Sequence, residues 1–170
     1  NALPVLRDFG YRAEFFVKTG KIGMKNYMSI DQLKEMKSAG MSIQSHGHTH
    51  SFLTMLDDNM LVQELKESRR IISDIICDDV EFLSYPGGRF DDRTESFVRR
   101  AGYKGSLRGR GYNKWGDLNL YGLKRQGVHA STSDRLFRAY IKNDRLYFLK
   151  QDMKRVILLW YRIIAKKLSA

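Results

Sequence analysis

Three of the four histidines of this chain lie in one short segment, SHGHTH at residues 45–50. Neutral imidazole is a good ligand for zinc and for other borderline divalent metals. His46 and His50 are four residues apart, so both rings could face one ion from a single helical turn or a tight loop, with His48 pointing elsewhere. We therefore predict a divalent-metal site at His46 and His50, with Zn as the metal that imidazole chemistry favours.

Metal-assisted hydrolysis needs more than two imidazoles. A catalytic site also has a further ligand, often a carboxylate, and an open position at which bound water becomes acidic. The histidine segment alone supplies neither the further ligand nor the open position. Alternatively, the segment is a solvated histidine-rich loop or a helix cap. The HExxH pattern of zinc peptidases does not fit, because Gly47 occupies the position of the required glutamate.

Helical and extended patterns alternate around this segment. In chain order we expect a strand at 13–17, a helix from Ser29 to Gly40, a strand at 41–45, a helix at 59–76, a strand at 80–85, a helix at 94–101, a strand at 103–107, a Gly- and Arg-rich loop, and a strand at 123–129. Repeated steps of this kind predict a parallel sheet with helical crossovers. Ligands bind at the carboxyl ends of such strands, so the loops after residues 45, 85 and 128 should share one rim.

Two of these helices are predicted in more detail. Ser29 stands before acidic and amide residues and should be the N-cap of the first helix. In the second helix, four apolar residues at helical spacing should cover one face of the sheet. Those residues are Leu61, Leu65, Ile72 and Ile76.

Composition limits the possibilities further. Of the 170 residues, 42% are hydrophobic, which is enough to form one core. The chain is too short to suggest several domains. Lys and Arg number 30 against 19 Asp and Glu, and the formal charge of +11 favours anionic partners such as acidic glycans, phospholipid headgroups or nucleic acid. Cys77 is the only cysteine, so no intramolecular disulfide can form, and we expect this side chain to be buried.

Residues 144–168 predict one basic amphipathic helix. Its apolar stripe consists of Leu146, Leu149, Met153, Val156, Ile157, Trp160 and Ile164. This helix could pack against the main domain with a solvated basic face, or it could attach to an anionic membrane or polysaccharide surface. We expect a domain at 1–143 and the helix at 144–170.

Several motifs together resemble one known family. Residues 45–53, SHGHTHSFL, resemble the second motif of the polysaccharide deacetylases, the NodB-homology or carbohydrate esterase family 4 domain, in which His-Ser/Thr-x-x-His is followed by Leu. Residues 82–88, FLSYPGG, are similar to the third motif, in which a Pro-Tyr-Gly segment lines the groove. Residues 123–125, LKR, resemble the Leu-Pro-Arg strand near the family's end. Together, the segments that resemble this family cover about residues 1–129.

The resemblance implies a fold and an activity. The fold would be α/β, a distorted (β/α) barrel of the polysaccharide deacetylase type, incomplete at the N-terminus. The activity would be metal-dependent hydrolysis of an N-acetyl group, or less often an O-acetyl group, of a glycan. His46 and His50 would hold the metal beside an aspartate, and a second aspartate would take a proton from water.

The resemblance also implies further site residues. Tyr85, Pro86, Gly87 and Arg125 would contact the substrate. His129 follows a predicted strand and is a candidate for the acid that protonates the leaving amine, although a hydrogen-bonded structural histidine explains it equally well.

The chain departs from the family pattern in its acidic residues. The Thr-Phe-Asp-Asp-Gly segment that carries both aspartates is absent, and we expect it in residues preceding Asn1. The aspartate pairs at 57–58, 78–79 and 91–92 are predicted to lie in exposed loops or helix caps. Ser84 stands where the family often has Arg, and Gly87 stands where it has Tyr. This chain alone is therefore expected to be inactive.

Two main functional hypotheses remain. In the first, the complete protein is a metal-dependent glycan deacetylase. In the second, it is a non-catalytic carbohydrate-binding or scaffold protein on the same fold. Under both, a glycan is the expected partner, a nucleic-acid partner is less favoured, and the resemblance implies the bacterial cell envelope or another extracytoplasmic place, with the cytoplasm as the alternative.

Overall fold

The structure is a computed structural model that describes residues 2–111, 113, 119–142, 144, 146, 147, 149, 150 and 153. These residues form two compact units, 1–125 and 126–170, which are described separately. The first unit contains the histidine segment. No helix in the described part of the chain is both long and apolar enough to cross a membrane.

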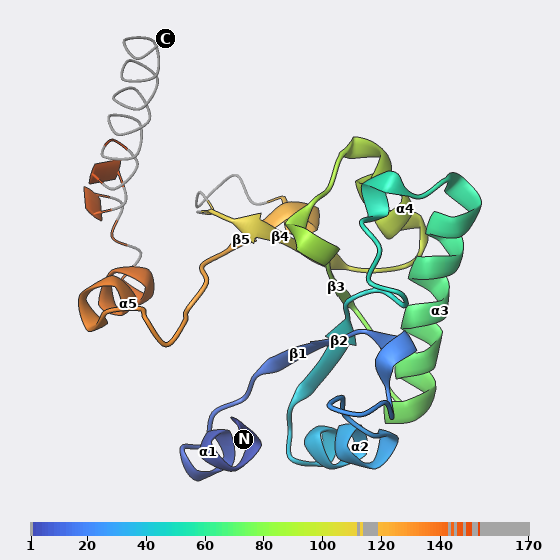
Figure 1. Cartoon of the computed structure of the whole chain (residues 1–170), viewed down its shortest axis with the longest axis horizontal. Coiled ribbons are helices and arrows are strands. Elements are labelled where there is room, and N and C mark those ends of the chain that lie inside the picture. The colour runs from blue at the N-terminus through green and yellow to red at the C-terminus, as the bar shows by residue number, and fades with distance from the viewer. Residues whose placement is uncertain are drawn as a thin grey trace, which may run out of the picture. The chain divides into compact units, whose positions relative to one another are not determined.

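The first unit is a parallel sheet with helices between its strands (Figure 1). Its helices are α1 (Ala2–Asp8), α2 (Ile30–Ser38), α3 (Asp58–Ile76) and α4 (Asp92–Arg100). Its strands are β1 (Glu14–Val17), β2 (Ser42–Ser45), β3 (Phe82–Ser84), β4 (Gly105–Arg110) and β5 (Leu123–Arg125). Four 3-10 helices occupy connections, namely η1 (Thr19–Lys21), η2 (Leu53–Met55), η3 (Pro86–Gly88) and η4 (Leu120–Gly122).

The strand order identifies the type of sheet. The five strands follow one another as β1-β2-β3-β4-β5, and every neighbouring pair is parallel. Crossovers between parallel strands are right-handed, so strands added always on the same side place their helices on the same face. Doubly wound sheets instead reverse their order at a switch point. The chain therefore has the α/β fold of a distorted barrel, as expected from the sequence.

Helix α3 provides much of the core. Leu61, Leu65 and Ile72 are completely buried and Ile76 is 8% exposed, which confirms the predicted apolar face. They pack in one cluster with sheet residues such as Ile43. Burial of each such side chain contributes about 1.5–3 kcal/mol of hydrophobic free energy.

The local signals for α2 are also confirmed. Ser29 Oγ accepts a hydrogen bond from the backbone N–H of Gln32, and the Gln32 side chain accepts one from the backbone N–H of Ser29. This reciprocal arrangement satisfies two backbone donors that the first helical turn leaves free. The helix therefore begins where the sequence predicts.

Two strand predictions need correction. The strand expected at 103–107 is β4, which begins at Gly105 and continues to Arg110 through the Gly- and Arg-rich segment, because its last residues pair with β5 after its pairing with β3 ends at Leu107. The strand expected at 123–129 is β5, which ends at Arg125, where its pairing with β4 ends. Residues 126–129 belong to no strand and form a loop.

Cys77 is exposed, contrary to expectation. It follows α3 as the C-cap residue and adopts a left-handed conformation, with φ 51°. A residue in this conformation ends the helix, so Cys77 lies one position beyond the buried Ile76.

The second unit contains one described helix, α5 (Asp134–Ile141), which the sequence analysis did not predict. Ser133 caps it by accepting a hydrogen bond from the backbone N–H of Leu136. The basic helix predicted at 144–168 falls mostly outside the described residues and stays a prediction, as does the domain boundary at 143.

Candidate metal centre

His46 and His50 face each other in the loop that follows β2. Their Nε2 atoms are 3.2 Å apart, and their ring centroids are 4.8 Å apart. The loop begins as a continuation of the sheet, because the backbone N–H of His46 donates to the carbonyl oxygen of Val17 in β1. His50 then turns its ring back towards His46 from a left-handed backbone conformation, with φ 73°.

The hydrogen bond made by His46 on its other nitrogen settles the tautomer. Its Nδ1 lies 2.7 Å from the carbonyl oxygen of Ser84, at the end of β3. A carbonyl oxygen only accepts, so Nδ1 carries the proton and Nε2 presents a lone pair towards His50. Metal-binding histidines are oriented by hydrogen bonds of this kind.

His48 points away from this pair, as the spacing predicts. Its Nδ1 lies 2.8 Å from the Oγ1 of Thr19, which is buried in η1. The backbone around His48 is held from the same direction, since its carbonyl oxygen accepts a 2.9 Å hydrogen bond from the N–H of Gly20. The loop after β1 therefore supports the first half of the histidine loop.

The second half of the loop is held by Glu64 of α3, which the sequence analysis did not single out as a site residue. Glu64 Oε1 accepts hydrogen bonds from three consecutive backbone N–H groups, at 2.8, 2.8 and 3.3 Å. These belong to His48, Thr49 and His50. A sequence signal did exist, because Glu64 falls on the apolar face of α3, next to Leu65.

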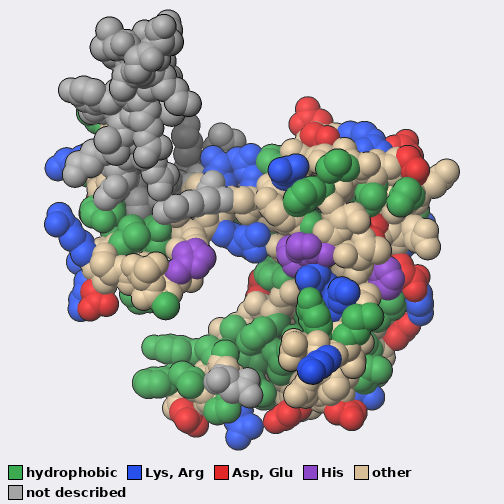
Figure 2. All heavy atoms as spheres, in the orientation of Figure 1, with side chains coloured by type: hydrophobic (Ala, Val, Ile, Leu, Met, Phe, Trp, Pro, Cys, Tyr) green, Lys and Arg blue, Asp and Glu red, His purple; other side chains and the backbone are tan. Residues whose placement is uncertain are grey.

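The surroundings favour the uncharged form of both imidazoles. Burial lowers the pKa of His46 below its ordinary value of 6.5, the hydrogen bond that its Nδ1 donates to the Ser84 carbonyl oxygen opposes this, and the neighbouring His50, Arg125 and Lys18 lower the pKa further. Burial also lowers the pKa of His50, and Lys18 adds to this effect. Figure 2 shows histidine side chains at the surface of the first unit, with lysine and arginine side chains next to them.

This arrangement fits two ligands of one divalent ion. Zinc–nitrogen bonds of about 2.0–2.1 Å in tetrahedral geometry separate two ligand nitrogens by roughly 3.3 Å. The observed Nε2 separation of 3.2 Å is close to that value. No group of three or more His, Cys, Asp or Glu side chains that could hold a metal occurs among the described residues.

The aspartate pairs lie in caps and loops, as predicted. Asp57 caps α3 by accepting from the backbone N–H of Met60, and Asp91 caps α4 by accepting from that of Thr94. Asp78 forms an ion pair with Lys37.

The loop after β3 lies against the histidine loop. Pro86 is buried, and its Cγ would lie 3.7 Å from a Cβ atom placed on Gly47. Gly87 is exposed, and a Cβ atom there would lie 2.4 Å from the ring of Phe52. Of the three residues expected to contact the substrate here, Gly87 has the accessible position.

Tyr85 occupies a different place from the one expected. Its side chain is completely buried, and its hydroxyl donates to the carbonyl oxygen of Tyr121 at 3.4 Å. Burial raises the pKa of this hydroxyl to about 12. The ring is part of the core because its neighbours on the sheet leave no path to solvent, so direct contact between this side chain and a substrate requires rearrangement.

Arg125 lies near the histidines and His129 lies in the second unit. Arg125 is half-buried at the end of β5, its Nε donates to the carbonyl oxygen of Arg108 at 3.2 Å, and burial lowers its pKa. His129 is exposed beyond the end of β5, and its backbone N–H donates to Thr132 Oγ1. The proposed acid role of His129 stays a prediction.

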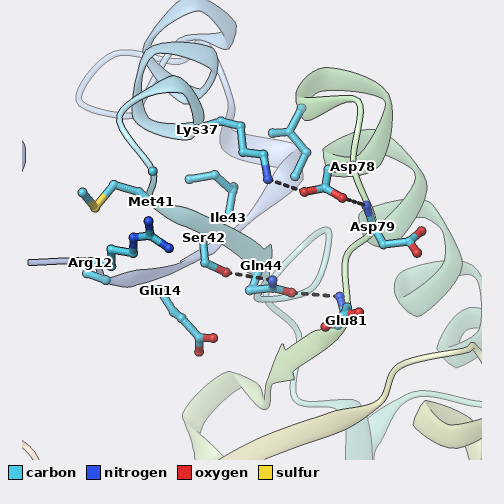
Figure 3. Close-up of a pocket in the computed structure, with 13 residues that line it drawn as sticks. Arg12, Glu14, Lys37, Met41, Ser42, Ile43, Gln44, Asp78, Asp79 and Glu81 are labelled. Carbon is cyan, nitrogen blue, oxygen red and sulfur yellow. Dashed lines mark hydrogen bonds and ion pairs between the residues drawn. The ribbon is translucent and has the colours of Figure 1, made fainter.

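A cavity of about 630 Å³ lies at the opposite, amino ends of β1, β2 and β3 (Figure 3). Gln44 forms part of its wall, and its amide is fully engaged, with Nε2 donating to Ser42 Oγ and Oε1 accepting from the backbone N–H groups of Glu81 and Phe82. In parallel α/β folds the chemistry takes place at the carboxyl ends of the strands. The histidine pair, and not this cavity, is therefore the candidate site.

Comparison with known proteins places these features in a family. A model of the family "Polysaccharide deacetylase" matches residues 1–106. The Bacillus subtilis protein YxkH, which is named among the polysaccharide deacetylases, is 29% identical over 143 residues, covering 84% of this chain and 51% of that protein. A Staphylococcus aureus poly-beta-1,6-N-acetyl-D-glucosamine N-deacetylase is 25% identical over 118 residues, covering 61% of this chain and 41% of that protein.

Solved structures agree. The Streptococcus pyogenes deacetylase PplD, solved in complex with acetate, superposes with a TM-score of 0.76 at 26% identity, covering 82% of this chain and 62% of that one. The chain spans about half the length of YxkH and less than half the length of the S. aureus N-deacetylase.

Proposed function

Because the chain belongs to the polysaccharide deacetylase family, we propose that it forms the metal-binding part of a hydrolase that removes N-acetyl, or less often O-acetyl, groups from a glycan. The observation that carries this proposal is the 3.2 Å approach of the two Nε2 atoms of His46 and His50. One S. aureus relative is named for the deacetylation of poly-beta-1,6-N-acetyl-D-glucosamine, so a polymer of N-acetylglucosamine is the substrate class to test first.

In this proposal His46 and His50 hold a divalent metal, with Zn as the first candidate. When bound there, such an ion would acidify a water molecule and polarise the acetyl carbonyl. The protein's contribution is to favour the neutral form of both imidazoles and to orient them. For His46, burial favours the neutral form, and the hydrogen bond to the Ser84 carbonyl oxygen orients the ring. Because no group of three or more His, Cys, Asp or Glu side chains that could hold a metal occurs among the described residues, we propose that a further ligand comes from outside them.

We propose that the substrate contacts the loop after β3 and the end of β5. Gly87 is exposed, so a sugar ring can approach its backbone. Arg125 offers a cationic donor near His46 and suits an anionic or strongly polar group. His129 is retained as the proposed donor of a proton to the leaving amine, on the family resemblance alone.

A second function is favoured by one observation. Ser84 and Gly87 stand where the family often has Arg and Tyr, which motivates a non-catalytic carbohydrate-binding or scaffold protein on the same fold. The two functions differ in acetate release and agree in glycan binding.

The deciding experiment measures acetate release from N-acetylglucosamine oligomers by the complete protein as the cell produces it, with zinc present. We expect release by the wild type and none by His46→Ala. Glycan binding by the wild type without any release would favour the non-catalytic function. We further propose the bacterial cell envelope or another extracytoplasmic place as the site of action, consistent with relatives that act on polysaccharides.

A further inference from the structure

Glu64 is an unusual residue for its position. It lies on the face of α3 that packs against the sheet, and only 5% of its surface is exposed. Carboxylates are almost never buried to this degree without partners, because removing a charge from water is costly. Within the described part of the chain, no Lys or Arg forms an ion pair with it.

All the hydrogen-bond partners of Glu64 come from the loop between the two metal-binding candidates. Oε1 accepts from the backbone N–H groups of His48, Thr49 and His50, and Oε2 accepts from the Thr49 hydroxyl at 3.0 Å. Successive N–H groups that converge on one oxygen form an anion-binding nest. Here the anion is supplied by the protein itself.

The loop is shaped to receive this carboxylate. Gly47 has φ 79°, and a Cβ atom there would lie 2.8 Å from Glu64 Oε1. His50 has φ 73°, a left-handed conformation that a non-glycine residue keeps only where its surroundings enforce it. The hydrogen bond from the His50 N–H to Glu64 is one such enforcing contact.

We propose that Glu64 is a positioning residue for the metal centre, which holds the backbone of residues 48–50 so that the His50 imidazole faces that of His46. This inference rests on the proposed metal-binding function of the two histidines. Glu64 does not touch the metal in this account. It acts through the loop, and the hydrogen-bonding geometry of its carboxylate is what matters.

The rest of the loop is anchored independently of Glu64. The N–H of Gly20 donates to the His48 carbonyl oxygen, and the N–H of Thr19 donates to the Gly47 carbonyl oxygen. Loss of the Glu64 hydrogen bonds should therefore leave the fold and the position of His46 intact and release His50. That outcome differs from general unfolding.

The test is zinc titration of the full chain, with the wild type, Glu64→Ala and Glu64→Gln compared. Loss of a partner that orients a metal ligand typically lowers metal affinity by about 10- to 100-fold, and we expect a loss of this size for Glu64→Ala. Glu64→Gln keeps an oxygen that can accept the three N–H bonds and should retain an affinity close to that of the wild type. Thr49→Val is the matched control, because it removes the Oε2 contact and the bonds of the Thr49 hydroxyl to Ser51 but keeps the three N–H bonds to Oε1, and it should also bind well.

A second readout separates positioning from stability. Cobalt(II) in place of zinc gives an absorption spectrum that reports ligand geometry, and Glu64→Ala should change this spectrum while Glu64→Gln should not. Equal zinc affinity in the wild type and Glu64→Ala, or equal losses in Glu64→Ala and Glu64→Gln, would overturn the inference. If Glu64→Ala does not fold, Gly47→Ala decides, because its Cβ displaces the carboxylate, and unchanged affinity there would overturn the inference too. A wild-type chain that binds no zinc would instead refute the proposed function.

Discussion

The hydrogen bond from His46 Nδ1 to the carbonyl oxygen of Ser84 determines which nitrogen of this histidine is free for a metal. It joins the loop after β2 to the end of β3, so the tautomer depends on the sheet being correctly assembled. The electrostatic surroundings act in the same direction, since burial and nearby cations lower the pKa of His46. Both effects favour the neutral ring, which is the form that binds a cation.

Stability should depend on pH through these histidines. The pKa values of His46 and His50 are lowered in the folded chain, so the unfolded chain binds more protons once the pH approaches 6.5. The free energy of unfolding should therefore fall as the pH is lowered from about 7.5 to about 5.5, with a chelator present. Urea denaturation across this range measures the effect, and His46→Gln should flatten the curve. An identical slope in that variant would contradict the assignment.

Gly87 should be intolerant of a side chain. Its φ is 63°, and a Cβ atom would lie 2.4 Å from the Phe52 ring, so Gly87→Ala adds steric overlap to backbone strain. We expect a loss of about 2–4 kcal/mol in the free energy of unfolding. Gly23→Ala is a matched control, because Gly23 has φ 77° and open space around its Cβ position, and it should lose about 1–2 kcal/mol. Equal losses would show that Phe52 does not constrain Gly87.

Among the secondary-structure elements, α3 links the core to the site. One face of it buries Leu61, Leu65 and Ile72, and the same face carries Glu64 to the histidine loop. The helix therefore has to be in register with the sheet for the loop to be held. Its Asp57 cap fixes where the helix begins.

Leu65→Ala should lower the free energy of unfolding by about 2–5 kcal/mol, because the side chain is completely buried and leaves a cavity. Met60→Ala, on the same helix and 53% exposed, should change it by less than about 0.5 kcal/mol. Guanidinium denaturation of both variants provides the measurement. A small effect of Leu65→Ala would mean that α3 is not packed as described.

The sequence predicted elements better than their ends and their long-range contacts. The apolar spacing of α3 and the Ser29 cap are local signals, and both are confirmed. The extension of β4 to Arg110 depends on pairing with β5, a strand more distant in the sequence, which no local pattern encodes. The His46 and His50 pair could be predicted because its members lie only four positions apart in the sequence. The contacts of His46 with Ser84 and of the loop with Glu64 depend on how distant segments pack.

For the whole molecule, charge and family membership are the informative properties. The formal charge of +11 should favour binding to anionic surfaces, including those that the sequence suggests for residues 144–168. Family membership is the basis of the proposed glycan partner. The two properties are compatible, since a glycan in the proposed envelope location would lie close to anionic lipids and polymers.

Binding of the full chain to vesicles that contain anionic lipid should weaken strongly as salt rises from about 0.05 to about 0.5 M, because salt screens attraction between exposed charges. Vesicles of zwitterionic lipid alone serve as the control and should bind little. Co-sedimentation measures both. Binding that is strong and independent of salt would contradict a role for the basic surface.

Metal analysis with zinc titration decides whether His46 and His50 together bind one metal ion. We expect one zinc per wild-type chain and at least about a tenfold loss of affinity in both His46→Ala and His50→Ala. His129→Ala, which changes an exposed histidine of the second unit, should bind like the wild type. Unchanged zinc content and affinity in His46→Ala and His50→Ala would show that these two histidines do not form the site.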